Sequence, residues 1–430
     1  MKKASLFRVL LLLLASVFLV TAGGQKEGAA KEEKIRIVHF HHTQPPFDEI
    51  HLNAAKSFMT KYPNVEVKFL MYADADLPTK VRTALVAGSE IDTFNIGSFQ
   101  STWFMENRLV EEIMPSAFGK QTVQEVIDMW EKDAIKKTGG FYEGKYYGLP
   151  SEMSNYAAWI NIAHMREAGL NPETDIPKTW GDFVDVAKKM TKDEGGVRVR
   201  NGFAINLKAS VFPFLILHSL MEQKGLDWGT EDGLFASLDT KEVVEALTTF
   251  TNWATKDNIF DPGLFDNERE GFGNGLTSTF LTGGAWYWGV LDEYTVPRED
   301  VTPFRYPRYK DGKDIGGVVY GYSSFVTKQA RNKEWAWKWL DHFLSHPELD
   351  IVHGNYQPRK TLDPALADKY IPNNDVFGYE RQHGAIILAS TKFNEIQDAV
   401  GEAVNRVVFR GISNEESIRI LKKEVKSISE

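Results

Sequence analysis

Strand-forming runs alternate with helix-forming runs at the start of the recognisable structure. Apolar residues follow strand patterns and helical spacing in turn. The runs, in chain order, cover residues 35–40, 47–62, 65–70, 77–87 and 91–96. Pro and Gly residues stand between them at positions typical of turns. An order of strand, helix, strand, helix, strand predicts a parallel sheet covered by helices, and therefore an α/β fold.

A second block of structure opens near residues 147–150. Thr179 is a suitable N-cap for a helix, because Asp182 stands at the capping-box position three residues later. The apolar face of that helix is formed by Phe183, Ala187 and Met190. Further helices are predicted at residues 241–256, 334–344 and 393–409. The helical and strand runs therefore continue to near the end of the sequence.

The length and the residue composition limit how the chain is organised. It has 430 residues, more than one hydrophobic core usually organises, so two lobes are expected. It contains no cysteine, which excludes disulfides, thiolate metal sites, cysteine nucleophiles and a lipid-anchoring cysteine. The net charge of −9 is spread along the chain, and no basic stripe suggests a nucleic-acid partner. Most of the 27 Phe, 15 Tyr and 11 Trp residues must lie in the core.

The first residues have the three parts of a secretory signal peptide. Positive charges at Lys2, Lys3 and Arg8 precede an apolar run at residues 9–20, and Ala22 ends a short segment of small residues. We expect residues 1–22 to be a signal peptide and residues 23–34 to be a flexible leader. The alternative is a membrane anchor, but the apolar run is short for a span, and nothing later approaches about 18 apolar residues. The expected product is exported, periplasmic and soluble, and has no lipid anchor.

Several short stretches occur in an order that matches a known family. They cover residues 58–67, 87–92, 144–150, 177–180, 272–286, 316–318 and 335–344. In this order and spacing the chain resembles the sugar-type extracellular solute-binding proteins of ABC importers, the family that includes maltose-binding protein. Ile91 departs from the pattern, because the family usually has proline there.

The resemblance implies two α/β lobes joined by hinge strands, with a ligand cleft between the lobes. The chain would cross between lobes near residues 149–151, 316–318 and 343–344. We therefore expect an N-terminal lobe and a C-terminal lobe that are each built from two segments. Their predicted limits are 35–150 plus 318–343, and 151–317 plus 344–430. The implied function is capture of a sugar for import, with a membrane permease as partner. We expect a monomer, with no cofactor, no metal and no catalytic residues.

Sugars present hydroxyls around apolar C–H faces, so their sites combine aromatic rings with carboxylates and amides. Trp286 matches the family position at which an aromatic ring packs on the ligand. Trp288 would point the same way if the segment were extended. For either residue the alternative is a place in the core.

The other candidate site residues come from strand ends and from segments that match family contacts. Glu152 lies in the first predicted crossing, and a solvated hinge carboxylate is its alternative. Gly97, Ser98 and Gln100 lie just beyond a parallel strand, where ligands of α/β sheets bind. The remaining candidates are Trp103, Asn206, Lys208, Phe212, Tyr322 and Tyr356. The segment of Asn206, Lys208 and Phe212 departs from the maltose-binding pattern, which argues against a linear maltodextrin.

Three histidines near the end of the first strand allow two interpretations. Alternation puts His39 and His41 on one strand face and His42 on the other. Two imidazoles could begin a metal site, but further ligands are not evident. We therefore expect His41 and His42 to lie at the mouth of the ligand cleft.

Two alternative functions remain open from the sequence. One is an extracellular carbohydrate-active enzyme, although no acid–base pair is singled out. The glycine-rich run at residues 271–275 lacks the Lys-Ser/Thr ending of a nucleotide loop, and residues 321–325 lack the second glycine of a nucleophile elbow. The other alternative is a binding protein for a non-sugar solute, such as a polyol, a phosphorylated polyol or a peptide.

Overall fold

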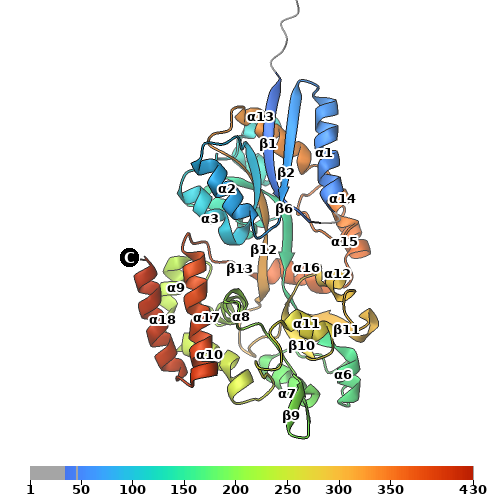
Figure 1. The fold of residues 1–430 in the computed structure, drawn as a ribbon, viewed down its shortest axis with the longest axis vertical. Coiled ribbons are helices and arrows are strands. Elements are labelled where there is room, and N and C mark those ends of the chain that lie inside the picture. The colour runs from blue at the N-terminus through green and yellow to red at the C-terminus, as the bar shows by residue number, and fades with distance from the viewer. Residues whose placement is uncertain (1–33, 45–46, 430) are drawn as a thin grey trace, which may run out of the picture.

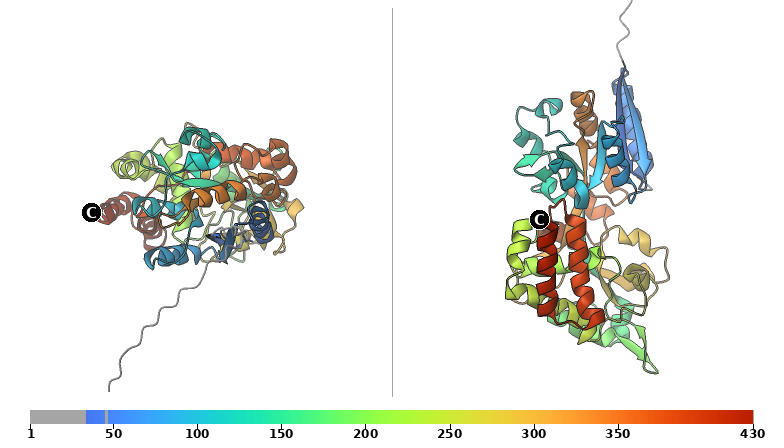
Figure 2. Two further views of the ribbon diagram at one scale, coloured as in Figure 1. Left: turned by 90° about the horizontal axis from the view of Figure 1, so that it is seen from above. Right: turned by 60° about the vertical axis from the view of Figure 1, so that its left-hand side comes forward.

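The computed structural model describes residues 34–44 and 47–429. The predicted signal peptide and nearly all of the predicted leader lie outside these residues. The described chain forms two bodies stacked along the long axis of the molecule (Figures 1 and 2). This arrangement agrees with the expected two-lobed α/β fold.

The upper body is built on a sheet with a parallel centre. Its strands are β1 (Ile35–His42), β2 (Val65–Tyr72), β3 (Thr93–Gly97), β6 (Gly148–Asn155), β12 (Gly316–Val326) and β13 (Gly384–Ile386). β1 pairs in parallel with β2 and β3, as predicted, and β12 pairs antiparallel with β3 and β6. The strands β1 to β3 end at the same edge of the sheet, which faces the lower body (Figure 1).

Helices cover both faces of this sheet because side chains alternate along β1. Ile37 packs into the core formed with Phe58 and Trp339, whereas Val38 and Phe40 pack into a core on the other face. The helices are α1 (Phe47–Lys61) and α13 (Lys333–Phe343) on the first face, and α2 (Leu77–Val86) and α3 (Ser98–Glu106) on the second. Smaller elements of this body are η1 (Pro115–Phe118), α4 (Val123–Ile127), α5 (Ala134–Lys137), β4 (Phe141–Tyr142) and β5 (Lys145–Tyr146).

The lower body contains a small antiparallel sheet inside a larger helical shell. β7 (Ala157–Asn161) is the central strand, between β10 (Thr279–Gly283) and β11 (Val301–Phe304). The surrounding elements are α6 (Ile162–Glu167), α7 (Trp180–Met190), β8 (Lys192–Glu194), β9 (Val197–Arg200), α8 (Val211–Gln223), α9 (Glu231–Ser237), α10 (Lys241–Thr255), α11 (Glu268–Gly273), α12 (Tyr287–Leu291), η2 (Arg298–Asp300), α17 (Phe393–Arg410) and α18 (Asn414–Ser429).

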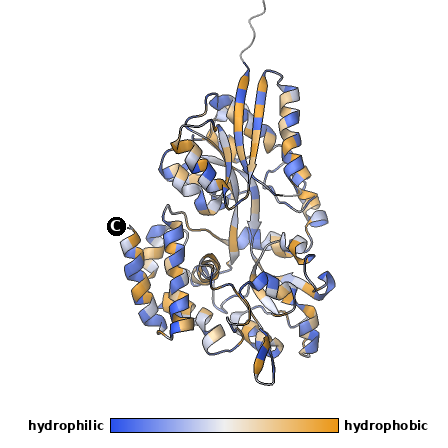
Figure 3. Cartoon of the chain, viewed as in Figure 1, coloured by the Kyte–Doolittle hydropathy of each residue, from blue (hydrophilic) through white to orange (hydrophobic). Residues whose placement is uncertain are grey.

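The predicted helices are confirmed in this body, and their amphipathic pattern explains their positions. Thr179 accepts a hydrogen bond from the backbone N–H of Asp182, and the Asp182 carboxylate accepts one from the Thr179 backbone, so the capping box is complete. Helix α18 buries Ile418, Leu421 and Val425, which recur at helical spacing. Figure 3 shows the resulting mixture of apolar and polar residues along the outer helices.

β6 and β12 join the two bodies. They pair antiparallel from Gly148 opposite Phe325 to Asn155 opposite Val319. In Figure 1 they run vertically through the narrow region between the two bodies, which we call the waist. Val319 packs into the upper core and Val318 into the lower one. This two-stranded ribbon lies where the first two crossings were predicted.

The chain returns to the waist a third time after α13, through α14 (Pro347–Ile351), α15 (Pro364–Tyr370) and α16 (Asn374–His383). The Met153 backbone N–H donates to the Tyr356 carbonyl over 2.8 Å, and Arg359 pairs with Trp130 in an isolated bridge. This segment therefore packs beside the ribbon and against the upper body, where it faces α1.

Candidate functional site

A β-bulge in the ribbon positions the central carboxylate of the waist. Tyr322 lies opposite Glu152, but Ser323 lies opposite Pro150, so Ser151 is an extra residue in β6. The Ser151 hydroxyl donates to the Tyr322 carbonyl over 3.1 Å and accepts from the Asn95 amide over 2.6 Å. The bulge is thus held in place from both sides, and Glu152 follows it directly.

His42 connects the end of β1 to the same place. Its Nδ1 lies 2.7 Å from Asn95 Oδ1, and its ring stacks on Tyr322 with centroids 4.3 Å apart. The Tyr322 hydroxyl in turn donates to Asp74 over 2.9 Å. His42 and Tyr322 therefore form one wall beside Glu152, with both rings oriented by hydrogen bonds.

Glu152 is a buried carboxyl group with one unpaired oxygen. Only 8% of the residue is exposed, and Oε2 has no hydrogen-bond partner among the described residues. Burial raises the pKa of Glu152, the His42 charge opposes this effect, and the nearby carboxylates Asp350 and Asp74 raise the pKa further. A bound molecule that donates a hydrogen bond to Glu152 Oε2 would satisfy this unpaired oxygen.

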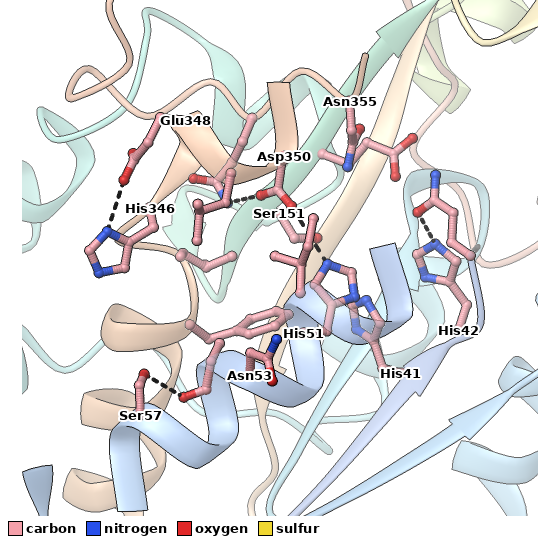
Figure 4. Close-up of a pocket in the computed structure, with 18 residues that line it drawn as sticks. His41, His42, His51, Asn53, Ser57, Ser151, His346, Glu348, Asp350 and Asn355 are labelled. Carbon is pink, nitrogen blue, oxygen red and sulfur yellow. Dashed lines mark hydrogen bonds and ion pairs between the residues drawn. The ribbon is translucent and has the colours of Figure 1, made fainter. Parts of the chain in front are cut away.

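A pocket of about 420 Å³ opens beside Glu152, between α1, the end of β1, β6 and the segment that contains α14 (Figure 4). Its volume is within the range of small-molecule sites, about 300–1,000 Å³. It is lined by His41, His42, Gln44, Ile50, His51, Asn53, Ala54, Ser57, Ser151, Glu152, Phe343, Leu344, His346, Glu348, Leu349, Asp350, Asn355 and Gln357. None of these described lining residues is Lys or Arg.

The pocket wall has polar atoms that lack partners within the described part of the chain. They are His41 Nε2, His51 Nδ1, Glu152 Oε2, Asp350 Oδ1 and Gln357 Oε1. Figure 4 shows His41 and His51 side by side beneath Asp350. Burial, followed by the neighbouring His51, His42 and His39, holds the pKa of His41 well below its usual range, so His41 is neutral at pH 7. Because buried polar atoms are normally hydrogen-bonded, these atoms mark a place for a polar ligand or water.

A second group of residues, which we call the aromatic group, lies on the lower side of the waist. It comprises Phe99, Tyr156, Phe212, Arg269, Trp286 and Tyr320. The half-buried Trp286 donates from Nε1 to the Tyr320 hydroxyl over 2.7 Å, and the Arg269 guanidinium lies 4.8 Å from the Trp286 ring centroid. Ring centroids of Tyr320 and Tyr156 are 4.9 Å apart. These contacts hold Trp286 in one orientation and leave part of its ring exposed.

The ribbon connects the pocket to the aromatic group. Tyr320 and Tyr322 are two residues apart on β12, so they point to the same face, and their partners on β6 are Ser154 and Glu152. The Glu152 charge contributes to the raised pKa of Tyr320, whose main cause is burial. Phe99 of the upper body lies near both Tyr320 and Phe393 of α17, at 5.7 and 5.6 Å between centroids. One face of the ribbon is thus lined by residues of both bodies.

The predicted residues of the β3 end lie at this waist. Gly97 is opposite Tyr322, and a Cβ on Gly97 would contact the Tyr322 ring at 3.6 Å. The Ser98 hydroxyl accepts from the Gly321 backbone over 3.3 Å, and Gln100 Oε1 is buried without a partner among the described residues. Trp103 is partly covered by the Arg82 guanidinium, 4.7 Å from its ring centroid.

Other predicted residues have side chains engaged elsewhere. Asn206 Oδ1 accepts from the backbone N–H groups of Lys208 and Ala209, and the exposed Lys208 pairs with Asp266 at 2.7 Å. Phe212 stacks under Arg269, 4.8 Å from its guanidinium carbon, and so belongs to the aromatic group.

Two further predicted rings are anchored by other residues. The Tyr356 hydroxyl donates to Glu131, and the Arg381 guanidinium lies 3.9 Å from the Tyr356 ring centroid. Trp288 does not point the same way as Trp286, because Trp286 is the N-cap residue of α12 and the segment that follows it is helical, not extended. Trp288 is 9% exposed and packs edge-on against Trp159 in a buried cluster.

Several residues that the structure brings to the site have no local signal that marks them in the sequence. They are Gln44, His51, Asp350, Asn355, Gln357, Arg269, Tyr320, Tyr156 and Phe99. Tyr320 is the exception and could have been found from its spacing to Tyr322 within one strand. Asp350 and Gln357 could not, because nothing local indicates that their segment returns to α1.

The fold and the waist define a two-lobed binding protein, and comparisons with known proteins agree. Residues 43–348 match the family model described as bacterial extracellular solute-binding protein, and the chain belongs to that family. Within the described residues, no helix is long and apolar enough to span a membrane, and no group of three or more His, Asp or Glu side chains is placed to hold a metal ion.

Individual relatives and structures add detail. The chain is 25% identical over 389 residues to a maltotriose-binding protein of Pyrococcus abyssi, covering 87% of this chain and 77% of that one. It is 24% identical over 349 residues to an arabinooligosaccharide-binding protein of Bacillus subtilis, covering 79% and 76%. An ABC substrate-binding protein from Listeria monocytogenes in complex with cycloalternan has a TM-score of 0.74 at 18% identity, with 92% of this chain and 98% of that chain covered. The structure of the sugar-binding protein MalE from Xanthomonas citri has a TM-score of 0.74 at 19% sequence identity, with 91% of this chain and 97% of that chain covered.

Proposed function

We propose that this protein is the exported substrate-binding component of an ABC importer and that it captures a sugar at the waist between its two lobes. The observation that carries the proposal is the ribbon face on which Trp286 and Tyr320 supply rings while Glu152 and His42 supply polar atoms. A sugar needs both kinds of contact at once. The relatives that bind maltotriose and arabinooligosaccharides support this class of ligand.

The proposed mechanism is closure around the ribbon. We assign residues 35–150 plus 318–343 to one lobe, and 151–317 plus 344–430 to the other. A sugar that contacts both lobes stabilises the closed form, because it binds that form more tightly than the open one. The closed form would then be recognised by the membrane permease. We propose that the protein acts as a monomer in the periplasm, without a lipid anchor.

We further propose binding without turnover. The unpaired polar atoms of the described pocket residues include amide and imidazole atoms as well as carboxylate oxygens, a mixture suited to holding sugar hydroxyls. The sugar would therefore leave the protein chemically unchanged.

A thermal-shift screen of the mature chain tests the proposal, with maltotriose, arabinooligosaccharides, cyclic glucans and simple hexoses as probes. A ligand that binds only the folded state must raise the melting temperature. We expect at least one sugar to do so with a stoichiometry of one and to be recovered intact. Absence of any sugar ligand, or steady release of a shortened product, would overturn the proposal.

A further inference from the structure

The pocket beside Glu152 has an unusual balance of hydrogen-bonding atoms and charge. Three carboxyl groups line it, those of Glu152, Glu348 and Asp350, and none of its described lining residues is Lys or Arg. Glu348 has a partner in His346, 3.0 Å away, whereas Glu152 Oε2 and Asp350 Oδ1 have no hydrogen bond in the described chain. The two buried carboxyl groups therefore have no Lys or Arg partner within the pocket, and imidazoles are the basic groups nearest to them: His42 beside Glu152 and His51 beside Asp350.

The unpaired oxygens of the pocket are acceptors. Gln357 donates from Nε2 to Asp350 Oδ2 over 3.2 Å, which leaves Gln357 Oε1 facing the pocket as a third free acceptor. Asp350 Oδ1 lies 3.7 Å from His51 Nε2, too far for a hydrogen bond. Glu152, Asp350 and Gln357 are all more than nine-tenths buried, so their free oxygens can be satisfied only by donors that enter the pocket, from water or from a ligand.

An ammonium group matches this arrangement better than a hydroxyl group. It carries three N–H donors and a positive charge, whereas a hydroxyl carries one donor and no charge. Glu152 and Asp350 act on each other as like charges, and the raised pKa of Glu152 reflects burial first and this repulsion among its further causes. A carboxylate or phosphate on the ligand would add to the repulsion.

We infer that the pocket binds a protonated amine of the ligand, and that the captured solute is an amino sugar. The inference rests on the proposed function, since it assigns the chemical class of the sugar captured at the waist. The amine would lie among Glu152 Oε2, Asp350 Oδ1 and Gln357 Oε1, and the sugar ring would extend past His42 toward the ribbon.

Matched sugar pairs that differ in one group test this inference. Calorimetry with the full mature chain would compare glucosamine with glucose, galactosamine with galactose, and the β-1,4-linked glucosamine disaccharide with cellobiose, at neutral pH. We expect the amine of at least one pair to bind at least about tenfold more tightly than the hydroxyl, the value of a charge-assisted contact. Glucuronate should bind more weakly than glucose.

Asp350→Asn removes the charge but keeps the shape, and should reduce the ratio of amine affinity to hydroxyl affinity within a pair by about tenfold. Glu334→Gln is the control, because Glu334 is exposed on α13 and pairs with Lys338, yet the change in net charge is the same. It should leave the preference intact. Melting curves establish that both variants fold.

The outcomes separate this inference from the proposed function. If neutral sugars bind and no amine is preferred, or if Asp350→Asn leaves the preference unchanged, the inference is overturned and the proposed function stands. If neither the amino sugars, the neutral sugars nor the oligosaccharides of the screen bind, the proposed function itself is overturned.

Discussion

The pocket and the aromatic group both border the ribbon, but they differ in whether their polar atoms have hydrogen-bond partners. In the aromatic group the polar atoms already have partners: Trp286 donates to Tyr320, and Arg269 donates to the Thr282 carbonyl over 3.0 Å. In the pocket, Glu152 and Asp350 have oxygens without partners in the described chain. Because its polar atoms already have hydrogen-bond partners, the aromatic group presents mainly ring surface to a ligand. The pocket presents free polar atoms, which can form directional hydrogen bonds. Under the proposed function, the aromatic group would contribute mainly affinity and the pocket mainly selectivity.

Trp288, on α12, provides the largest expected effect. Trp288→Ala removes a buried ring that packs on Trp159, so it should lower the free energy of unfolding by about 3–5 kcal/mol. Denaturant unfolding measures this directly. If Trp288→Ala were as stable as wild type but bound sugar poorly, Trp288 would belong to the site and the aromatic group would have to be redrawn.

Trp286→Ala should give the opposite pattern. Trp286 is half-buried, so its loss should leave the fold intact but remove a ring from the site. We expect affinity for the sugar found in the screen to fall at least about tenfold, since ring contacts contribute about 1 kcal/mol beyond buried area. Calorimetric affinity and melting temperature, measured on the same sample, separate the two effects. A large loss of stability with unchanged affinity would place Trp286 in the core.

A pH experiment distinguishes the pocket from the aromatic group without any ligand. The pKa of Glu152 is raised above its ordinary value of 4.5 in the folded state, chiefly by burial, so the folded protein binds this proton more tightly than the unfolded one. The stabilisation that follows is complete below pH 4.5 and is lost as pH rises through the folded pKa. Compared with Glu152→Gln, wild type should therefore gain stability as pH falls from neutral toward 4.5.

Denaturant unfolding of both proteins at several pH values measures that difference, and comparison with the variant cancels the opposite effect of buried neutral histidines such as His41. Parallel pH profiles for wild type and Glu152→Gln would mean that Glu152 is solvated, and the pocket would lose its main feature.

Lys208 gives the smallest expected effect. Its side chain is 73% exposed and pairs with Asp266 on the surface. Lys208→Ala should change the free energy of unfolding by at most about 1 kcal/mol and leave sugar affinity within about twofold. A tenfold loss of affinity in calorimetry would show that the Asn206–Lys208 turn moves onto the ligand.

Local sequence patterns predicted the frame of the molecule well. The opening strands and helices, and the capping box of Thr179 and Asp182, depend on neighbours a few residues away, and the structure confirms them. The direction of Trp288 could not be predicted from local patterns, because it depends on whether residues 287–291 are extended or helical, and they are helical.

The pocket is the part that the sequence could not reveal. His51 on α1 and Asp350 on α14 are about 300 positions apart, yet they face each other over 3.7 Å. Their proximity follows from the third passage of the chain through the waist, which no local periodicity encodes. The family resemblance, by contrast, predicted Glu152 and Trp286 as candidate site residues. The order of the matched motifs indicates how the chain is arranged in space, and composition does not.

The central claim is that the pocket and the aromatic group bind one ligand together. Calorimetry with the amino sugar that binds most tightly among the matched pairs, on wild type, Trp286→Ala and Asp350→Asn, tests it most directly. The account predicts one site per chain in wild type and an affinity loss of at least about tenfold for each variant with the same ligand, an amino sugar. If either variant binds that ligand as tightly as wild type while remaining folded, the two regions do not act on one molecule, and the claim is contradicted.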